Sequence, residues 1–146
     1  MTRIQIGRTN RLGFAAVAGL EGYVRANVDR ELLDLLKLRA SILNGCGFCI
    51  DMHATAGAKH GISQRRLHAV GGWQHAGDLF DERERAVLAL TDAITRVDAD
   101  SVTDEIWAAA AQWFDDGEMG AIVLAIATIN VWNRIAISTR MPLPAA

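Results

Sequence analysis

Two cysteines and one histidine form the part of this sequence best suited to chemistry. Cys46 and Cys49 lie three residues apart, and His53 follows the second cysteine by four residues. On a helix, residues three or four apart lie on one face, so the two sulfurs and the imidazole come close together. A thiol becomes nucleophilic when it ionises, and a nearby base or a helix N-terminus favours ionisation. The spacing therefore predicts a reactive dithiol, with His53 beside Cys49.

The short spacing also indicates what a disulfide between these cysteines would do. A bridge between residues three apart closes almost no loop, so it stabilises the fold little by restricting the unfolded chain. Secreted proteins that rely on disulfides use more cysteines at wider spacing, whereas this chain has two. We therefore expect a Cys46–Cys49 disulfide that forms and breaks during function.

Two other interpretations of the cysteine pair stay open. Cysteine pairs with a histidine also bind structural zinc, but a closed site needs four ligands. The sequence has no second cysteine pair, and His60, His68 and His75 are not placed as an obvious partner. Two buried structural cysteines can also share this spacing by chance. Haem attachment is excluded, because no histidine directly follows Cys49.

The elements that must position these residues are predicted to be helices. Ala and Leu supply most of the apolar residues, proline occurs only at Pro142 and Pro144, and no strand alternation of useful length is found. The sequence predicts an all-α, single-domain bundle of about seven helices over residues 1–146. Apart from the two helices around the motif, these cover about residues 14–26, a stretch capped by Ser63 that weakens at Gly71, a stretch opened by Asp81 and Glu84, a stretch capped by Ser101 or Thr103 that reaches Phe114, and residues 118–137.

The cysteine pair is expected at the start of a central helix. One helix, capped by Asp29, runs to about residue 43, and the next covers residues 46–60. Asn44-Gly45 separates them, because both residues tolerate left-handed backbone. The free N–H groups at the start of the second helix then point toward the two sulfurs.

Charge and hydropathy exclude two classes of partner. The formal net charge is −2, which argues against a nucleic-acid partner. The most apolar run, residues 119–129, is shorter than the roughly 20 residues that a bilayer requires, so no membrane partner is expected. The apolar residues 14–20 continue as an amphipathic pattern rather than as a signal peptide. We expect a cytoplasmic protein.

Residues 34–53, which read DLLKLRASILNGCGFCIDMH, resemble the core motif of the alkylhydroperoxidase D-like proteins within the carboxymuconolactone decarboxylase family. The resemblance extends through Trp73, residues 82–90 and residues 129–134. It implies an all-helical fold, a homo-oligomer (trimer or hexamer), and thiol-dependent reduction of hydroperoxides. The disulfide would be reduced again by an external thiol or protein, and no metal or organic cofactor is expected.

The resemblance also implies a role for each residue of the motif. The second cysteine of the family is peroxidatic, which corresponds to Cys49, and the first is resolving, which corresponds to Cys46. The following histidine, here His53, belongs to the proton relay. The helix dipole alone would favour Cys46 as the nucleophile. We follow the family, because His53 is one turn from Cys49 and two turns from Cys46.

The chain departs from the family pattern at two positions. The relay glutamate usually lies twelve positions before the first cysteine, where this chain has Asp34, and Glu31 is a competing candidate one turn earlier. Some members carry a histidine immediately before the second cysteine, where this chain has Phe48. We expect Asp34 to serve as the distal carboxylate of a relay to His53.

Two rival functions and one unexplained pair of residues remain. A carboxymuconolactone decarboxylase, which acts on ring-opened aromatic compounds, would share the fold but has no need of a dithiol. A non-enzymatic redox-sensing or metal-binding module would keep the disulfide without turnover. Asn133 and Arg134 are polar residues in an apolar helix, for which a buried ion pair or a subunit contact is the expectation.

Overall fold

The computed structural model describes residues 1–143, and the predicted all-α class is confirmed over them. The helices are α1 (Ile6–Thr9), α2 (Arg11–Asn27), α3 (Arg30–Asn44), α4 (Gly47–Lys59), α5 (Gln64–Ala69), α6 (Glu82–Thr95), α7 (Asp104–Ala111) and α8 (Asp116–Thr139). Two short 3-10 helices, η1 (Val70–His75) and η2 (Gly77–Leu79), connect α5 to α6. Within the described residues these are eight α-helices, one more than expected, because a short α1 precedes the first predicted helix.

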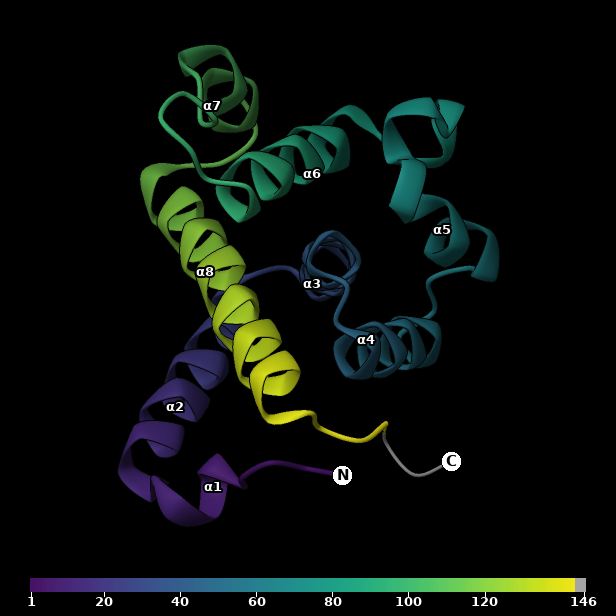
Figure 1. The fold of residues 1–146 in the computed structure, drawn as a ribbon. Helices are drawn as coiled ribbons and strands as arrows, with labels where there is room; N and C mark the ends of the chain where they lie inside the picture. The colour runs from purple at the N-terminus through teal and green to yellow at the C-terminus, as the bar shows by residue number, and fades with distance from the viewer. Residues whose placement is uncertain (144–146) are drawn as a thin grey trace.

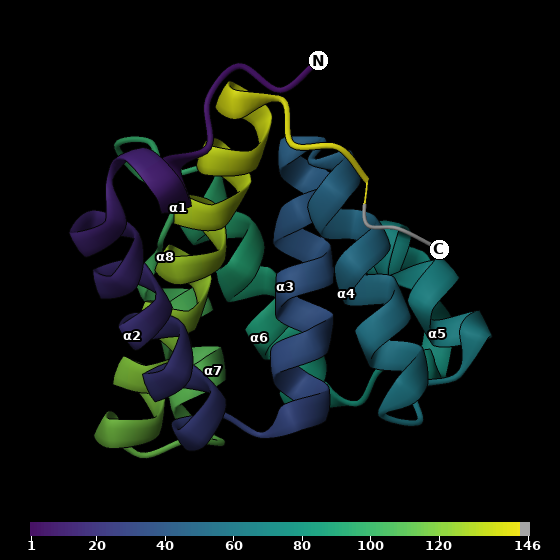
Figure 2. The same cartoon turned by 90° about the horizontal axis from the view of Figure 1, so that it is seen from below.

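Helix α3 lies at the centre of the fold and carries the chain into the cysteine motif. It is seen end-on in Figure 1, with α4, α6 and α8 around it, and it packs against all three. Ten consecutive residues of α3, from Leu32 to Ser41, are buried. In Figure 2 α3 and α4 run side by side, while α2 lies along α8. The hairpin of α3 and α4 therefore has one helix in the core and the other on its flank.

Helix ends follow the predicted capping residues closely. The Asp29 side chain accepts a hydrogen bond from the backbone N–H of Leu32 at 3.1 Å, and Gly45 ends α3 in the left-handed conformation with φ 66°. Ser63 caps α5, the Asp81–Glu84 capping box opens α6, and Thr103 rather than Ser101 caps α7. Helix α8 begins at Asp116 instead of Glu118, because Asp115 and Glu118 form a second capping box. The sequence analysis did not identify this box.

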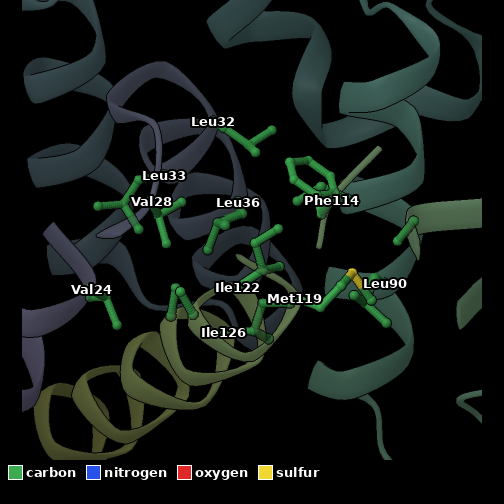
Figure 3. Packing of buried hydrophobic residues seen from close by; sticks show 14 of the residues in the cluster. Val24, Val28, Leu32, Leu33, Leu36, Leu90, Phe114, Met119, Ile122 and Ile126 are labelled. Atoms are coloured by element: carbon green, nitrogen blue, oxygen red, sulfur yellow. The ribbon is translucent and has the colours of Figure 1, made fainter. Parts of the chain in front are cut away.

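The apolar core has two main parts, one on each side of α3. The larger part joins α3 to α2, α6 and α8, and Figure 3 shows Leu36 of α3 close to Ile122 and Ile126 of α8 within it. The smaller part joins α3 to the segment from α4 to η1 and to α6, around Leu38 and other buried apolar residues. Burial of apolar side chains on both sides fixes α3 in position and direction.

Helix α8 is long and apolar enough to cross a bilayer by length and composition alone. The core helix of a folded domain has the same composition, because its apolar residues pack against other helices. Ten residues of α8 are buried, and the helix packs against α2, α3 and α6. This packing accounts for the apolar residues on the buried side of α8.

Gly57 allows close packing of α4 against its neighbours and generates the first prediction. A Cβ atom there would lie 2.9 Å from Leu67 Cδ2 and 3.3 Å from Ile62 Cδ1. Gly57→Ala should therefore lower the free energy of unfolding by about 1–3 kcal/mol through overpacking. Gly22→Ala is the matched control, since nothing lies within 4 Å of its Cβ, and it should stabilise α2 by about 0.5–1 kcal/mol. Urea denaturation measures both, and equal effects would contradict the packing argument.

Candidate active site

The two cysteines lie at the start of α4 and are joined in a disulfide, as predicted. Cys46 is the N-cap of α4 and Cys49 lies in its first turn, with their Cα atoms 5.3 Å apart. Both residues are almost completely buried. The backbone N–H of Cys49 donates to Cys46 Sγ at 3.3 Å, so a free N–H at the helix N-terminus does point at a sulfur.

The turn that presents Cys46 is attached to α8 by side-chain amides. Asn44 Nδ2 donates to the side-chain oxygens of Asn130 at 2.9 Å and Asn133 at 2.8 Å. Asn133 is fully buried, and its own Nδ2 donates to Ser41 Oγ at 3.0 Å. Arg134 lies at the surface and donates to Asn130. Of the two alternatives expected for Asn133 and Arg134, the buried ion pair is wrong, because an amide network holds Asn133 and fixes the start of α4, while the subunit contact stays a prediction.

His53 lies one turn after Cys49 and is 7 % exposed. Its Nε2 atom is buried and has no hydrogen-bond partner among the described residues. Burial lowers the pKa of His53 from 6.5 to about 4, and the nearby ammonium of Lys37 is the second largest cause of this shift. The carboxylate of Glu21 acts in the opposite direction. The imidazole is therefore neutral near pH 7 and able to accept a proton.

The structure does not join either predicted carboxylate to His53. Asp34 Oδ2 lies 2.5 Å from Nδ1 of His60, and Glu31 forms an ion pair with Arg66 at the surface. The Cβ of Asp34 faces Gly57, so Asp34 lies one turn beyond His53 on the antiparallel hairpin. Asp34 and His53 do line the same polar cavity of about 390 Å³, but the carboxylate is bound by His60.

Residues 21 and 37 form a buried ion pair beside His53 that the sequence analysis missed. The side chain of Lys37 is 3 % exposed and its ammonium hydrogen-bonds the carboxylate of Glu21. Arg25 Nε at 2.7 Å and Trp132 Nε1 at 3.3 Å donate to the same carboxylate. Burial opposes ionisation of Glu21, but the hydrogen bonds from Lys37 and Arg25 outweigh it and lower its pKa. The sequence did contain a signal for this ion pair, because Lys37 lies between two leucines in an apolar helix.

A second cavity connects the reactive sulfur with apolar side chains. It has a volume of about 250 Å³, and both Cys49 and His53 line it. Its apolar walls come from α2, α4, α8 and the segment after α8: Phe14, Phe48, Met52, Trp132, Ala136 and Met141. The rings of Phe14 and Trp132 meet edge to face at 5.2 Å. The cavity therefore offers a small apolar molecule access to Cys49 next to a neutral imidazole.

The wall formed by Met141 is attached to the beginning of the chain. The backbone N–H of Arg3 donates to the carbonyl of Thr139 at 2.9 Å, and its guanidinium donates to the carbonyl of Ser138 at 3.2 Å. Met141 N donates to the carbonyl of Ala136 at 3.0 Å, which folds the chain back after α8. The two ends of the described chain thus meet beside the apolar cavity.

The alternative of structural zinc finds no support in the geometry. Within residues 1–143, no three His, Cys, Asp or Glu side chains gather closely enough to hold a metal ion. Cys46 and Cys49 are bonded to one another instead.

The low pKa of His53 predicts a dependence of stability on pH. The unfolded chain binds a proton at His53 near pH 6.5, whereas the folded chain binds it only near pH 4. This contribution is therefore complete above pH 6.5 and is lost as pH falls toward 4, by about 3 kcal/mol. His53→Gln should flatten the curve of unfolding free energy against pH in this window, measured by urea denaturation. A wild-type curve with the same slope as the variant would contradict the assignment.

Comparison with known proteins agrees with this geometry. A protein of unknown function from Agrobacterium tumefaciens, proposed to be an antioxidant defence protein of the AhpD type, is 35 % identical, covers all of both chains and superposes with a TM-score of 0.94. The uncharacterised protein YdfG of Bacillus subtilis (strain 168) is 33 % identical over 127 residues, 86 % of each chain. The debrominase Bmp8 shares the fold at 21 % identity, with a TM-score of 0.82 over 96 % of this chain and 75 % of its own.

The sequence model of the carboxymuconolactone decarboxylase family matches residues 9–93. The match spans α2 to α6 and so includes the hairpin, both cysteines and His53. The chain belongs to the carboxymuconolactone decarboxylase family and, within it, is an alkylhydroperoxidase D-like protein.

Proposed function

We propose that this protein is a thiol-dependent peroxidase that reduces hydroperoxides through the Cys46–Cys49 pair. The observation that carries the proposal is the position of Cys49, which is bonded to Cys46, lies one turn from a neutral histidine and lines an apolar cavity. These are the parts that a dithiol peroxidase needs: a nucleophile, a base, a resolving thiol and a place for the substrate.

The reaction follows from these parts. In the reduced protein, His53 accepts the proton of the Cys49 thiol, and the thiolate attacks the terminal oxygen of the hydroperoxide. An S–O bond forms, the O–O bond breaks, and the leaving alkoxide takes the proton back as an alcohol, which leaves Cys49 as a sulfenic acid. The Cys46 thiol then attacks that sulfur, water leaves and the disulfide forms. An external dithiol, the second substrate, reduces it again.

The cavity supports Cys49 rather than Cys46 as the peroxidatic residue. Cys49 lines the apolar cavity with His53, whereas Cys46 is not part of its wall. The N–H that points at Cys46 Sγ favours a thiolate there, as the helix dipole predicts. That stabilisation suits the resolving step, in which Cys46 must also become a nucleophile.

The size and walls of the cavity support an organic hydroperoxide as the substrate. A space of about 250 Å³ with six apolar side chains around it holds a small alkyl or aryl group. The fold itself does not select peroxides, since Bmp8 is a debrominase and has been crystallised with 2,3,4-tribromopyrrole. The peroxide assignment therefore depends on the dithiol and has to be tested directly.

The assignment of roles predicts different outcomes for the two cysteine variants. Cys49→Ser should abolish the reaction with cumene hydroperoxide, because the nucleophile on the cavity is gone. Cys46→Ser should react once and stop at a sulfenic acid on Cys49, because the resolving thiol is missing. Stopped-flow fluorescence follows the reaction, and dimedone labelling with mass spectrometry locates the sulfenic acid.

The wild-type protein provides the control for this experiment. With dithiothreitol as reductant it should consume many equivalents of cumene hydroperoxide, and it should react faster with this substrate than with hydrogen peroxide. A sulfenic acid on Cys46 in the Cys49→Ser variant would reverse the roles. A single equivalent consumed despite excess reductant would favour a redox sensor, and no consumption with either peroxide would refute the proposal.

We further propose that the protein acts in a reducing compartment such as the cytoplasm, with a thiol or dithiol protein as reductant. We also propose that it forms a homo-oligomer built on trimers. Three large apolar side chains of α8, Leu124, Val131 and Ile137, are between 37 % and 47 % exposed and provide surface for a subunit contact. Light scattering at micromolar concentration should give a multiple of the 15.8 kDa chain mass. A monomer mass would contradict this proposal and leave the peroxidase proposal intact.

A further inference from the structure

The ion pair of Lys37 and Glu21 occupies the place where a relay carboxylate was expected. On the antiparallel hairpin, Asp34 of α3 lies beside Gly57 of α4. One helical turn closer to the bend, residues 37 and 38 of α3 therefore lie beside His53 of α4. Leu38 belongs to the apolar core, while Lys37 and His53 line the same polar cavity. Lys37 is thus the ionisable residue of α3 that lies beside the His53 imidazole.

The charges around His53 come from three helices. Glu21 and Arg25 face it from α2, and Arg30, Asp34 and Lys37 face it from α3, while His60 lies at the end of its own helix. Helix α8 contributes the apolar walls Trp132 and Ala136. The Asp34 carboxylate is bound by His60, and the side chain of Arg25 is 68 % exposed. Water screens Arg25, so the buried ammonium of Lys37 is the cation that acts most strongly on the imidazole.

We propose that Lys37 is a positioning residue for the chemistry of His53: its buried ammonium, kept charged and in place by Glu21, maintains His53 as a neutral base that readily gives up the proton it accepts. A carboxylate at this position would do the opposite and stabilise the imidazolium. The inference rests on the proposed role of His53 in the peroxidase reaction.

The consequence for the reaction concerns the leaving group. His53 takes the proton of the Cys49 thiol, and the same proton must reach the departing alkoxide once the O–O bond breaks. An imidazolium next to a buried cation is a stronger acid, because protonation places two positive charges side by side. Lys37 therefore favours the second transfer and disfavours the first to the same extent. The buried Nε2 of His53 has no partner in the described chain, so no hydrogen bond to a protein acceptor stabilises the imidazolium at that nitrogen.

Glu21 favours the charged form of Lys37. Burial lowers the pKa of Lys37, and the hydrogen bond and charge of Glu21 counteract this effect. The carboxylate is in turn fixed by Arg25 and Trp132. The pair therefore places a cation in a buried position, where burial alone disfavours the charge of a lysine.

The proposal predicts that Lys37→Met raises the pKa of His53. The side chain of methionine fills the same space without charge, so the imidazole loses its cationic neighbour and should titrate at least one pH unit higher than in the wild type. Imidazole NMR shifts of the oxidised protein against pH measure this value. In the reduced protein, the pH profile of Cys49 alkylation by iodoacetamide should shift as well.

Arg39→Met is the matched control, because Arg39 is a second buried cation on the same helix that faces away from the site. It forms hydrogen bonds to Asp92 at 2.6 and 2.8 Å and to the carbonyl of Gly71 at 2.6 Å. Its loss should destabilise the fold as Lys37→Met does, but it should leave the titration of His53 unchanged. Lys37→Arg, which keeps the charge, should keep the pKa of His53 low.

The wild-type titration alone can overturn the inference. If His53 titrates near 6.5 in the wild type, Lys37 has no such influence, whether or not the Lys37→Met variant folds. Equal shifts in Lys37→Met and Arg39→Met would show a general effect of destabilisation and also refute it. None of these measurements uses a peroxide, so a failure of the proposed peroxidase activity is recognised separately.

Discussion

The attachment of the Asn44–Gly45 turn to α8 is the constraint on which the site depends. Gly45 ends α3 in a left-handed conformation, and the chain reverses within two residues. Asn133 attaches this reversal to α8 through Asn44 and Ser41, and Asn133 and Ser41 are themselves completely buried. A hydrogen-bonded network centred on a completely buried amide permits little movement. The sulfur of Cys46 and the first turn of α4 therefore have fixed positions relative to α8, which supplies Trp132 and Ala136 to the cavity.

Sequence reasoning found the parts of the site that lie close together along the chain. Cys46, Cys49 and His53 share one helix, so helical periodicity alone brings them onto one face. Helix caps at Asp29, Ser63 and Asp81 were found for the same reason, since a cap involves residues three positions apart. The cap at Asp115 also involves a residue three positions away, Glu118, so it could have been predicted from the sequence.

The parts of the site that come from different helices escaped the sequence analysis. The partner of Asp34 was taken to be His53, but the register of the hairpin places Asp34 a turn further out, beside His60. Register depends on how Gly57 and its neighbours pack, which spacing alone does not give. Glu21 joins the site because α2 packs along α8, a contact between segments more than a hundred residues apart. A buried lysine at position 37 signalled a buried partner, but the sequence did not say which of the seventeen acidic residues it would be.

The two ends of the described chain, near Arg3 and Met141, meet beside the apolar cavity and lie apart from the helices that carry the reactive group. The reactive group sits in the α3–α4 hairpin, whereas Met141 and the strap formed by Arg3 and Thr139 lie outside it. Changes in these outer segments alter the shape of the cavity at the cost of a few surface contacts, and the buried core stays intact. In this chain, the terminal segments can therefore change with less disturbance of the packing than the helices that carry the sulfur. For anyone who engineers this protein, the segments around Arg3 and Met141 are the place where the shape of the cavity is most easily redesigned.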